Sequence, residues 1–177
     1  MLAFRKSIRL QCLPNTINMS SSFMSTVLQS NHNSVDETQQ SSLIDGESYR
    51  VQLGEGIRTI ELMKSSSKNL IDRNLALDLT SKLNLFSNSD TIECITFATE
   101  DQYVFSNGID EDDLTVRGIT LLNDVKTLVT TIDKANNHDN KVTVSVLEGT
   151  FSGSGLGIFS ASKFKLATDT SKLKIDE

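Results

Sequence analysis

Residues 142–157 read VTVSVLEGTFSGSGLG, and this stretch carries the clearest fold signal in the 177-residue chain. Its first part alternates Val with Thr and Ser, which is typical of a strand with one buried face. Glycines follow at positions 149, 153, 155 and 157. A strand that enters a glycine-rich turn and then a helix presents unpaired backbone N–H groups at the start of that helix. Such a turn suits a phosphate group or a developing oxyanion.

Two other interpretations of the same turn stay open. The glycines partly match the dinucleotide-binding fingerprint, but that spacing needs a glycine where Ile158 stands. The glycines can also serve packing alone, because a residue without a side chain allows a helix to approach closely.

From Ser48 onward the chain alternates between strand and helix patterns. Apolar periodicity predicts strands within 48–62, a helix over 70–86 and a helix over 114–132. A short apolar run predicts a strand over 92–97, and a further strand is predicted over 164–167. Polar breaks predict loops at 64–69 and 136–140, and 99–113 have no clear period. This alternation predicts an α/β domain.

Charge is distributed unevenly along the chain. Its 17 Lys and Arg against 23 Asp and Glu give a net charge of −6, yet no acidic residue precedes Asp36. The acid-free segment contains Arg5, Lys6 and Arg9 among many serines. We therefore predict a mitochondrial transit peptide over 1–35, a linker over 36–47, a domain over 48–177 and a location in the mitochondrial matrix. A disordered polar tail is the alternative for the first segment.

Several classes of protein are excluded by composition. No run approaches the roughly 20 apolar residues of a transmembrane helix. A net negative chain with no basic stripe in its predicted domain argues against nucleic acid as a partner. With only Cys12 and Cys94, neither a disulfide scaffold nor a four-cysteine zinc site can form, and no metal site is expected. Cys94 falls in a predicted strand and is expected to be a buried core residue.

A second glycine motif, FSNGID at 105–110, follows the predicted strand at 92–97. Together with 153–157 it resembles the crotonase (enoyl-CoA hydratase/isomerase) superfamily. In that superfamily two such turns each give one backbone N–H to the thioester carbonyl of an acyl-CoA. The resemblance runs from about Ser48 to the end and includes 62–75. It implies a spiral of ββα units, of which this chain would hold the N-terminal half.

The resemblance also implies roles for individual residues. The N–H groups of Ile109 and Ser154 would bind the carbonyl oxygen as it becomes an oxyanion. The substrate would lie against Gly108, Asp110, Gly153 and Gly155. Coenzyme A would be part of the substrate, so no separate cofactor is implied.

Residue 157 indicates a branch within the superfamily. Crotonase-type hydratases carry a glutamate there, whereas this chain has Gly157, as does the 3-hydroxyisobutyryl-CoA hydrolase branch. Residues 164–169 and 175–177 are similar to that branch's closing segment and put Glu177 on its catalytic glutamate. The implied function is thioester hydrolysis in valine catabolism. The chain departs from the branch at Ser154, where the branch has glycine, and at Val142 and Asp176, where it has proline.

A second function remains open beside the hydrolase. These departures, and a chain shorter than the complete spiral, also fit a catalytically inactive relative. Such a relative would be a structural subunit of a mitochondrial assembly, with the small mitoribosomal subunit as the natural candidate. The partner would then be mitoribosomal or another copy of the chain. Neither His32 nor His138 lies in a motif, and we expect His138 to be a solvated loop residue.

Overall fold

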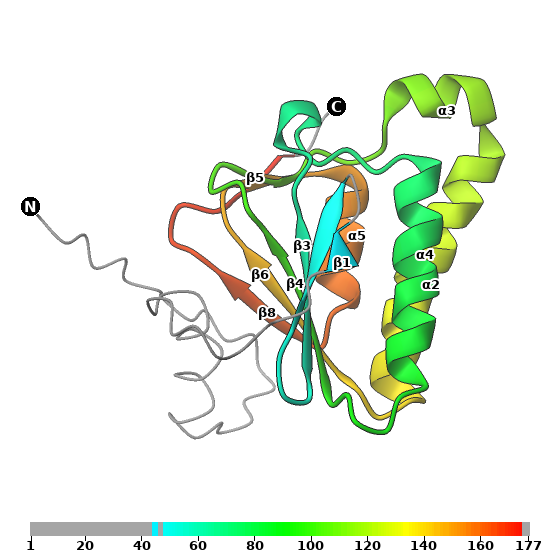
Figure 1. Cartoon of the computed structure of the whole chain (residues 1–177). Helices are drawn as coiled ribbons and strands as arrows, with labels where there is room; N and C mark the ends of the chain where they lie inside the picture. Colours follow the sequence, from blue (N-terminus) through cyan, green and yellow to red (C-terminus); the bar gives the residue numbers. More distant parts are fainter. Residues whose placement is uncertain (1–43, 46–47, 175–177) are drawn as a thin grey trace, which may run out of the picture.

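A computed structural model describes residues 44–45 and 48–174, which form a mixed sheet with helices packed beside it (Figure 1). The main sheet has the order β1-β2-β3-β4-β6-β8. Strands β1 to β3 are antiparallel neighbours, whereas β3, β4, β6 and β8 run parallel. The strands are β1 (Ile44–Asp45), β2 (Tyr49–Leu53), β3 (Ile57–Leu62), β4 (Cys94–Thr99), β6 (Val142–Leu147) and β8 (Phe164–Ala167).

A smaller parallel sheet, β5-β7-β9, completes the spiral. Its strands are β5 (Val104–Ser106), β7 (Thr150–Phe151) and β9 (Lys172–Leu173). Each follows a main-sheet strand directly, so the pairs β4–β5, β6–β7 and β8–β9 are successive turns of one spiral. The predicted spiral of ββα units is confirmed. None of the small-sheet strands was predicted, because strands of two or three residues are too short for a period to be visible.

The helices are α2 (Arg73–Ser87), α3 (Glu111–Arg117), α4 (Ile119–Asn137) and α5 (Gly153–Ala161), with a short 3₁₀ turn η1 (Ser65–Ser67). Helices α2, α4 and α5 lie on one side of the main sheet (Figure 1). The side chains that α2 and α4 turn toward the core include fully buried ones, as Leu79 and Leu83 of α2 and Leu128 and Ile132 of α4 illustrate. None of the helices in the described part of the chain is long and apolar enough to cross a bilayer.

The predicted helix over 114–132 is wrong in its extent. Two helices occupy this region, α3 from Glu111 and α4 as far as Asn137, and they are separated at Gly118. The backbone of Gly118 has φ +53° and ψ −128°, a conformation that ends α3 and that residues with a Cβ avoid. Apolar spacing continues across this glycine, and therefore periodicity alone joined the two helices.

The predicted single buried face of β6 is also wrong. Thr143 and Ser145 are fully buried, whereas Val142 and Val146 are only half-buried. Hydrogen bonds make this burial of polar side chains possible. The hydroxyl of Thr143 donates to Asn136 Oδ1 at 2.7 Å, and Ser145 Oγ lies 2.6 Å from Ser162 Oγ.

Gly149 supplies the first prediction. A Cβ built on Gly149, whose φ is +75°, would lie 2.0 Å from the carbonyl carbon and oxygen of Tyr103, where β5 and β7 pair. We expect Gly149→Ala to lower the free energy of unfolding by more than about 4 kcal/mol, because backbone must move to relieve the clash. Chemical denaturation measures this.

Gly118→Ala is the matched control. Gly118 also has a positive φ, but nothing lies within 4 Å of a Cβ built there. Its substitution should cost only the backbone strain, about 1–3 kcal/mol. Equal losses in the two variants would contradict the packing at Tyr103.

Candidate functional site

The two glycine motifs lie against each other, and we call their contact, residues 106–109 and 152–155, the glycine seam. Ser152 makes both of the hydrogen bonds that join the turns. Its backbone N–H donates to Ser106 O at 2.9 Å, and its hydroxyl donates to Asn107 O at 2.9 Å. Ser106 is anchored in turn, because its hydroxyl donates to Asn69 O at 2.8 Å. Two segments about 45 residues apart in sequence are thereby held at a fixed distance.

Glycines allow the close approach of the turns. A Cβ on Gly108 would lie 3.4 Å from the Cα of Gly153, and a Cβ on Gly153 would lie 3.1 Å from the Cα of Gly108. A Cβ on Gly155 would lie 2.8 Å from the Cβ of Ser106. Close contact accounts for glycine at 155, and positive φ angles of +105° and +49° account for glycine at 108 and 153, so these glycines by themselves do not indicate a ligand.

The backbone N–H of Ile109 is left without a partner by the way its turn is anchored. Ile71 N donates to Gly108 O at 2.8 Å, and Asp110 N donates to Ile71 O at 3.1 Å, which makes a parallel bridge between Ile71 and Ile109. In such a bridge the bonds come from the residues before and after Ile109, and its own N–H points away from Ile71. Among the described residues this N–H has no hydrogen-bond acceptor.

The backbone N–H of Ser154 lies in the first turn of α5. The first N–H groups of an α-helix have no acceptor four residues earlier within the helix. A serine at the N-cap commonly supplies one, but the hydroxyl of Ser152 is bonded to Asn107 O and makes no capping bond. The positive end of the α5 dipole is therefore not neutralised by its N-cap side chain.

Both N–H groups belong to the glycine seam. A Cβ on Gly108 would lie 3.7 Å from the nitrogen of Ser154, and a Cβ on Gly153 would lie 4.0 Å from the nitrogen of Ile109. Gly153 is exposed to solvent, whereas Gly108 and Ser154 are buried. The two amide nitrogens therefore lie on facing turns, beside a glycine that solvent reaches, and backbone N–H groups in such a place can bind a ligand oxygen. The individual roles of Gly108, Ile109, Gly153, Ser154 and Gly155 remain predictions.

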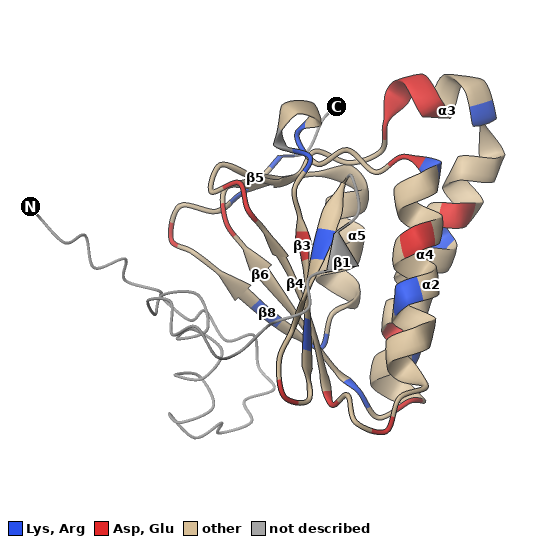
Figure 2. Ribbon diagram, in the orientation of Figure 1, with Lys and Arg blue, Asp and Glu red and all other residues tan. Residues whose placement is uncertain are grey.

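Asp110 has a structural task in this fold. Its carboxylate is the N-cap of α3 and accepts from the N–H groups of Asp112 at 3.0 Å and Asp113 at 3.1 Å. Acidic residues occupy the first turn of α3 and Arg117 its last turn, in accord with the helix dipole (Figure 2). A contact between Asp110 and substrate remains a prediction.

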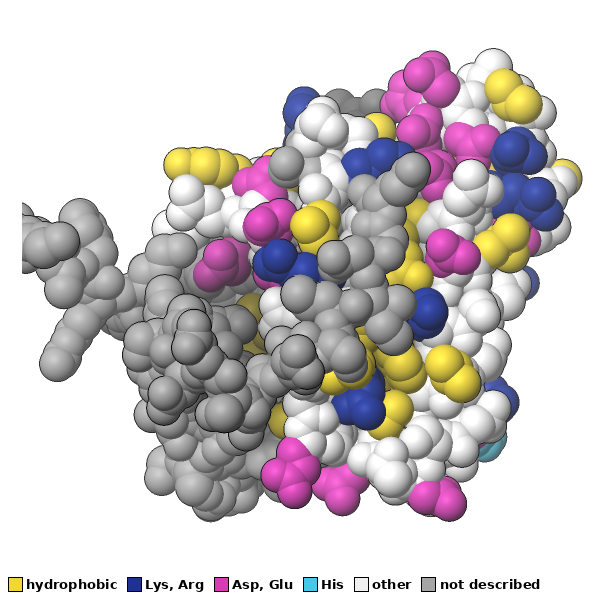
Figure 3. All heavy atoms as spheres, viewed as in Figure 1, with side chains coloured by type: hydrophobic (Ala, Val, Ile, Leu, Met, Phe, Trp, Pro, Cys, Tyr) yellow, Lys and Arg dark blue, Asp and Glu magenta, His cyan; other side chains and the backbone are white. Residues whose placement is uncertain are grey.

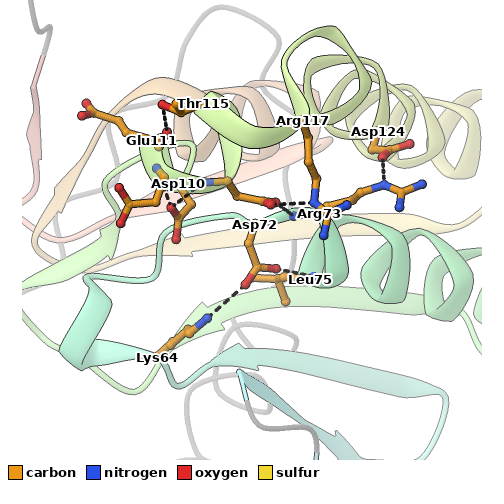
Figure 4. Close-up of polar contacts among 11 residues, drawn as sticks. Lys64, Asp72, Arg73, Leu75, Asp110, Glu111, Thr115, Arg117 and Asp124 are labelled. Atoms are coloured by element: carbon orange, nitrogen blue, oxygen red, sulfur yellow. Dashed lines mark hydrogen bonds and ion pairs between the residues drawn. The ribbon is translucent and has the colours of Figure 1, made fainter.

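A network of charged side chains attaches α3 to the neighbouring helices (Figure 4). Asp113 Oδ2 accepts from the backbone N–H of Arg73, the first residue of α2, at 2.8 Å, and Asp113 Oδ1 pairs with Arg117 Nε at 2.6 Å. Arg73 Nε pairs with Asp124 Oδ2 of α4 at 2.8 Å. Acidic side chains gather on the surface over α3 (Figure 3). The hydrogen bond from the Arg73 backbone, with the Arg117 guanidinium, holds the pKa of the Asp113 carboxyl below its usual value.

The remaining residues singled out by the sequence lie elsewhere. A Cβ on Gly157 would lie 3.1 Å from Val129 Cγ2 of α4, so glycine there allows α5 to pack on α4. Cys94 is buried, as predicted, and burial raises the pKa of its thiol, which makes it a poor nucleophile. His138 is exposed at the end of α4. Glu177, His32 and the predicted transit peptide over 1–35 lie outside the described residues.

Comparisons with known proteins bear on the fold. No family model matches the sequence, and no curated protein matches it. Solved structures do match. An enoyl-CoA hydratase/isomerase from Marinobacter aquaeolei is 16% identical at a TM-score of 0.66, over 72% of this chain and 51% of that one. An enoyl-CoA hydratase from Bacillus halodurans is 21% identical (TM-score 0.63, 72% and 52%), and Pseudomonas aeruginosa AtuE is 20% identical (TM-score 0.65, 72% and 50%).

These comparisons establish the fold and its extent. The chain spans about half the length of the solved structures that it matches. At such identities the likeness concerns the fold, and function is argued separately. The described part of this chain has the crotonase fold over that length.

Because Asp113 attaches α3 to α2, we predict that the stability of the fold depends on pH. Because the pKa of Asp113 is depressed in the folded chain, its ionised form stabilises the fold above its ordinary pKa. This stabilisation should be lost as the pH falls from about 4 through the lower pKa that Asp113 has in the folded chain. In Asp113→Asn the melting temperature should be lower than in the wild type at pH 7, and the difference should narrow towards pH 3.

Thermal melts followed by circular dichroism between pH 7 and pH 3 measure this. Asp112→Asn is the matched control, because the neighbouring Asp112 side chain is exposed. At pH 7 it should differ from the wild type far less than Asp113→Asn does, because it loses only the interaction of an exposed carboxylate with the helix dipole. A constant difference between Asp113→Asn and the wild type over this range would contradict the assignment.

Proposed function

We propose that the chain binds an acyl-CoA thioester at the glycine seam and, with Glu177, forms the active site of a thioester hydrolase. One observation carries the proposal. The N–H groups of Ile109 and Ser154 come from turns joined by Ser152, and each lies within about 4 Å of a Cβ built on the glycine of the opposite turn. Two fixed donors beside one small volume are the requirement for an oxyanion site.

Such a site lowers the barrier to attack on a thioester. As a nucleophile adds, the carbonyl oxygen gains negative charge, and donors held in place bind it more strongly in the transition state than in the ground state. Each donor typically contributes about 3 kcal/mol to transition-state stabilisation. The two proposed donors would then supply roughly 6 kcal/mol, provided that their effects add.

Hydrolysis is favoured over hydration by residue 157. A hydratase of this kind needs a second carboxylate on the first turns of the helix after the glycine motif, and Gly157 supplies none. Gly157 also lies against Val129, which leaves little room for a longer side chain at position 157. Glu177 is the proposed carboxylate. It either activates water for attack on the carbonyl, or attacks the carbonyl itself, so that the C–S bond breaks, the coenzyme A thiolate leaves and water opens the resulting anhydride. We propose 3-hydroxyisobutyryl-CoA as the substrate, in the mitochondrial matrix.

A second candidate is a catalytically inactive subunit of a mitochondrial assembly, such as the small mitoribosomal subunit. It is favoured by apolar side chains exposed at the junction of α3 and α4, where Val116 is 81% and Ile119 is 68% exposed. Co-sedimentation with the small mitoribosomal particle at high salt would support this candidate. Migration as a small free species would exclude it.

The hydrolase proposal predicts release of coenzyme A from 3-hydroxyisobutyryl-CoA by the purified chain. In Glu177→Gln, which keeps the size of the side chain, kcat should fall about 10²–10⁴-fold, because an amide cannot act as a base or nucleophile here. Thiol release followed by a colorimetric reagent measures this.

Asp176→Asn is the matched control, since it removes a neighbouring carboxylate that has no proposed role. Its kcat should stay within a few-fold of the wild type. If the wild type neither turns over nor binds any acyl-CoA ester, the proposed function is wrong.

A further inference from the structure

Ser154 carries a buried hydroxyl for which the described part of the chain offers no hydrogen-bond partner. Ser154 is 9% exposed, and its Oγ is buried and unpaired. The other two serines of this region, Ser106 and Ser152, both use their hydroxyls, on Asn69 O and Asn107 O. A buried polar group without a partner lowers stability, so it needs an explanation. Ser154 is also a position at which the resemblance leads one to expect glycine.

The position of this hydroxyl suggests the explanation. Ser154 is the second residue of α5, and its own backbone N–H lies at the glycine seam. The N–H and the side-chain O–H of one residue are close enough to donate to the same oxygen atom. Helix N-termini bind oxyanions through their backbone N–H groups, and a serine hydroxyl in the first turn can add one further donor.

We infer that the hydroxyl of Ser154 is a third hydrogen-bond donor to the ligand oxygen at the glycine seam, beside the N–H groups of Ile109 and Ser154. This inference rests on the proposed function, because it takes that oxygen to be the carbonyl of an acyl thioester. Ser154 is then a specificity-determining residue for ligands that place an acceptor oxygen at the seam. A ligand without that oxygen leaves the hydroxyl unpaired and gains nothing from it.

Binding of two matched ligands tests the inference. One is 3-hydroxyisobutyryl-CoA, and the other is its thioether analogue, in which a methylene group replaces the carbonyl. Ser154→Ala removes the hydroxyl and keeps both the Cβ and the backbone N–H. It should weaken binding of the ester about 2- to 12-fold. Binding of the thioether should be unchanged, and isothermal titration calorimetry measures both affinities.

The melting temperature of the ligand-free protein supplies a second readout. Because the hydroxyl of Ser154 has no partner to lose, Ser154→Ala should melt at or above the wild-type temperature. Ser152→Ala is the matched control. It removes the donor to Asn107 O and should melt at a lower temperature.

The outcomes separate the two claims. If the wild type prefers the ester to the thioether but Ser154→Ala binds both as the wild type does, the third donor is wrong and the proposed function stands. If Ser154→Ala melts as low as Ser152→Ala, the hydroxyl is structural and the inference is wrong. If the wild type binds neither CoA ligand, the proposed function fails and the inference fails with it.

Discussion

The two hydrogen bonds from Ser152 to the backbone of Ser106 and Asn107 are the constraint on which the candidate site depends. They join the end of β5 to the start of α5. The hydroxyl bond also occupies the group that would otherwise cap α5, so the side chain that closes the glycine seam leaves the N–H of Ser154 without a capping bond. Ser152 therefore both joins the two turns and leaves the N–H of Ser154 without a capping bond.

The spiral explains why these segments meet. Each turn sends one strand to the main sheet and the next strand to the small sheet, so β5 and β7 become parallel neighbours although about 45 residues separate them. Parallel neighbours end at the same edge, and the turn that follows each strand must therefore lie beside the other. Glycine at 108, 153 and 155 allows the turns to touch. Ile71 then orients the N–H of Ile109 through its bridge.

The attachment of α3 differs from that of the other helices. None of its residues is fully buried, and only the partly buried Leu114 packs against the core, so apolar packing contributes little to holding it. Capping by Asp110, the bond from the Arg73 backbone to Asp113 and the ion pair of Asp113 with Arg117 take that role. Asp110 directly follows Ile109, and the start of α3 is therefore coupled to the donor in the seam.

Many of the strands, helices and turns could be predicted from local sequence. Period-two alternation located β2, β3 and β6, a short apolar run located β4, four-residue spacing located α2, and the two glycine motifs located the turns of the seam. These features depend on neighbours along the chain, so a sequence can encode them directly. Local spacing could not find the break at Gly118, nor β5 and β7, because short strands and a glycine between two apolar repeats leave no period of their own.

Only the tertiary structure decided which polar side chains have hydrogen-bond partners. The valines of β6 were expected inside, yet Thr143 and Ser145 are more deeply buried, because Asn136 and Ser162 supply hydrogen-bond partners from other elements. Of three serines in or beside the glycine turns, only Ser154 is left unpaired. Whether a polar side chain is paired depends on atoms that folding brings from distant parts of the chain, and no local pattern records them.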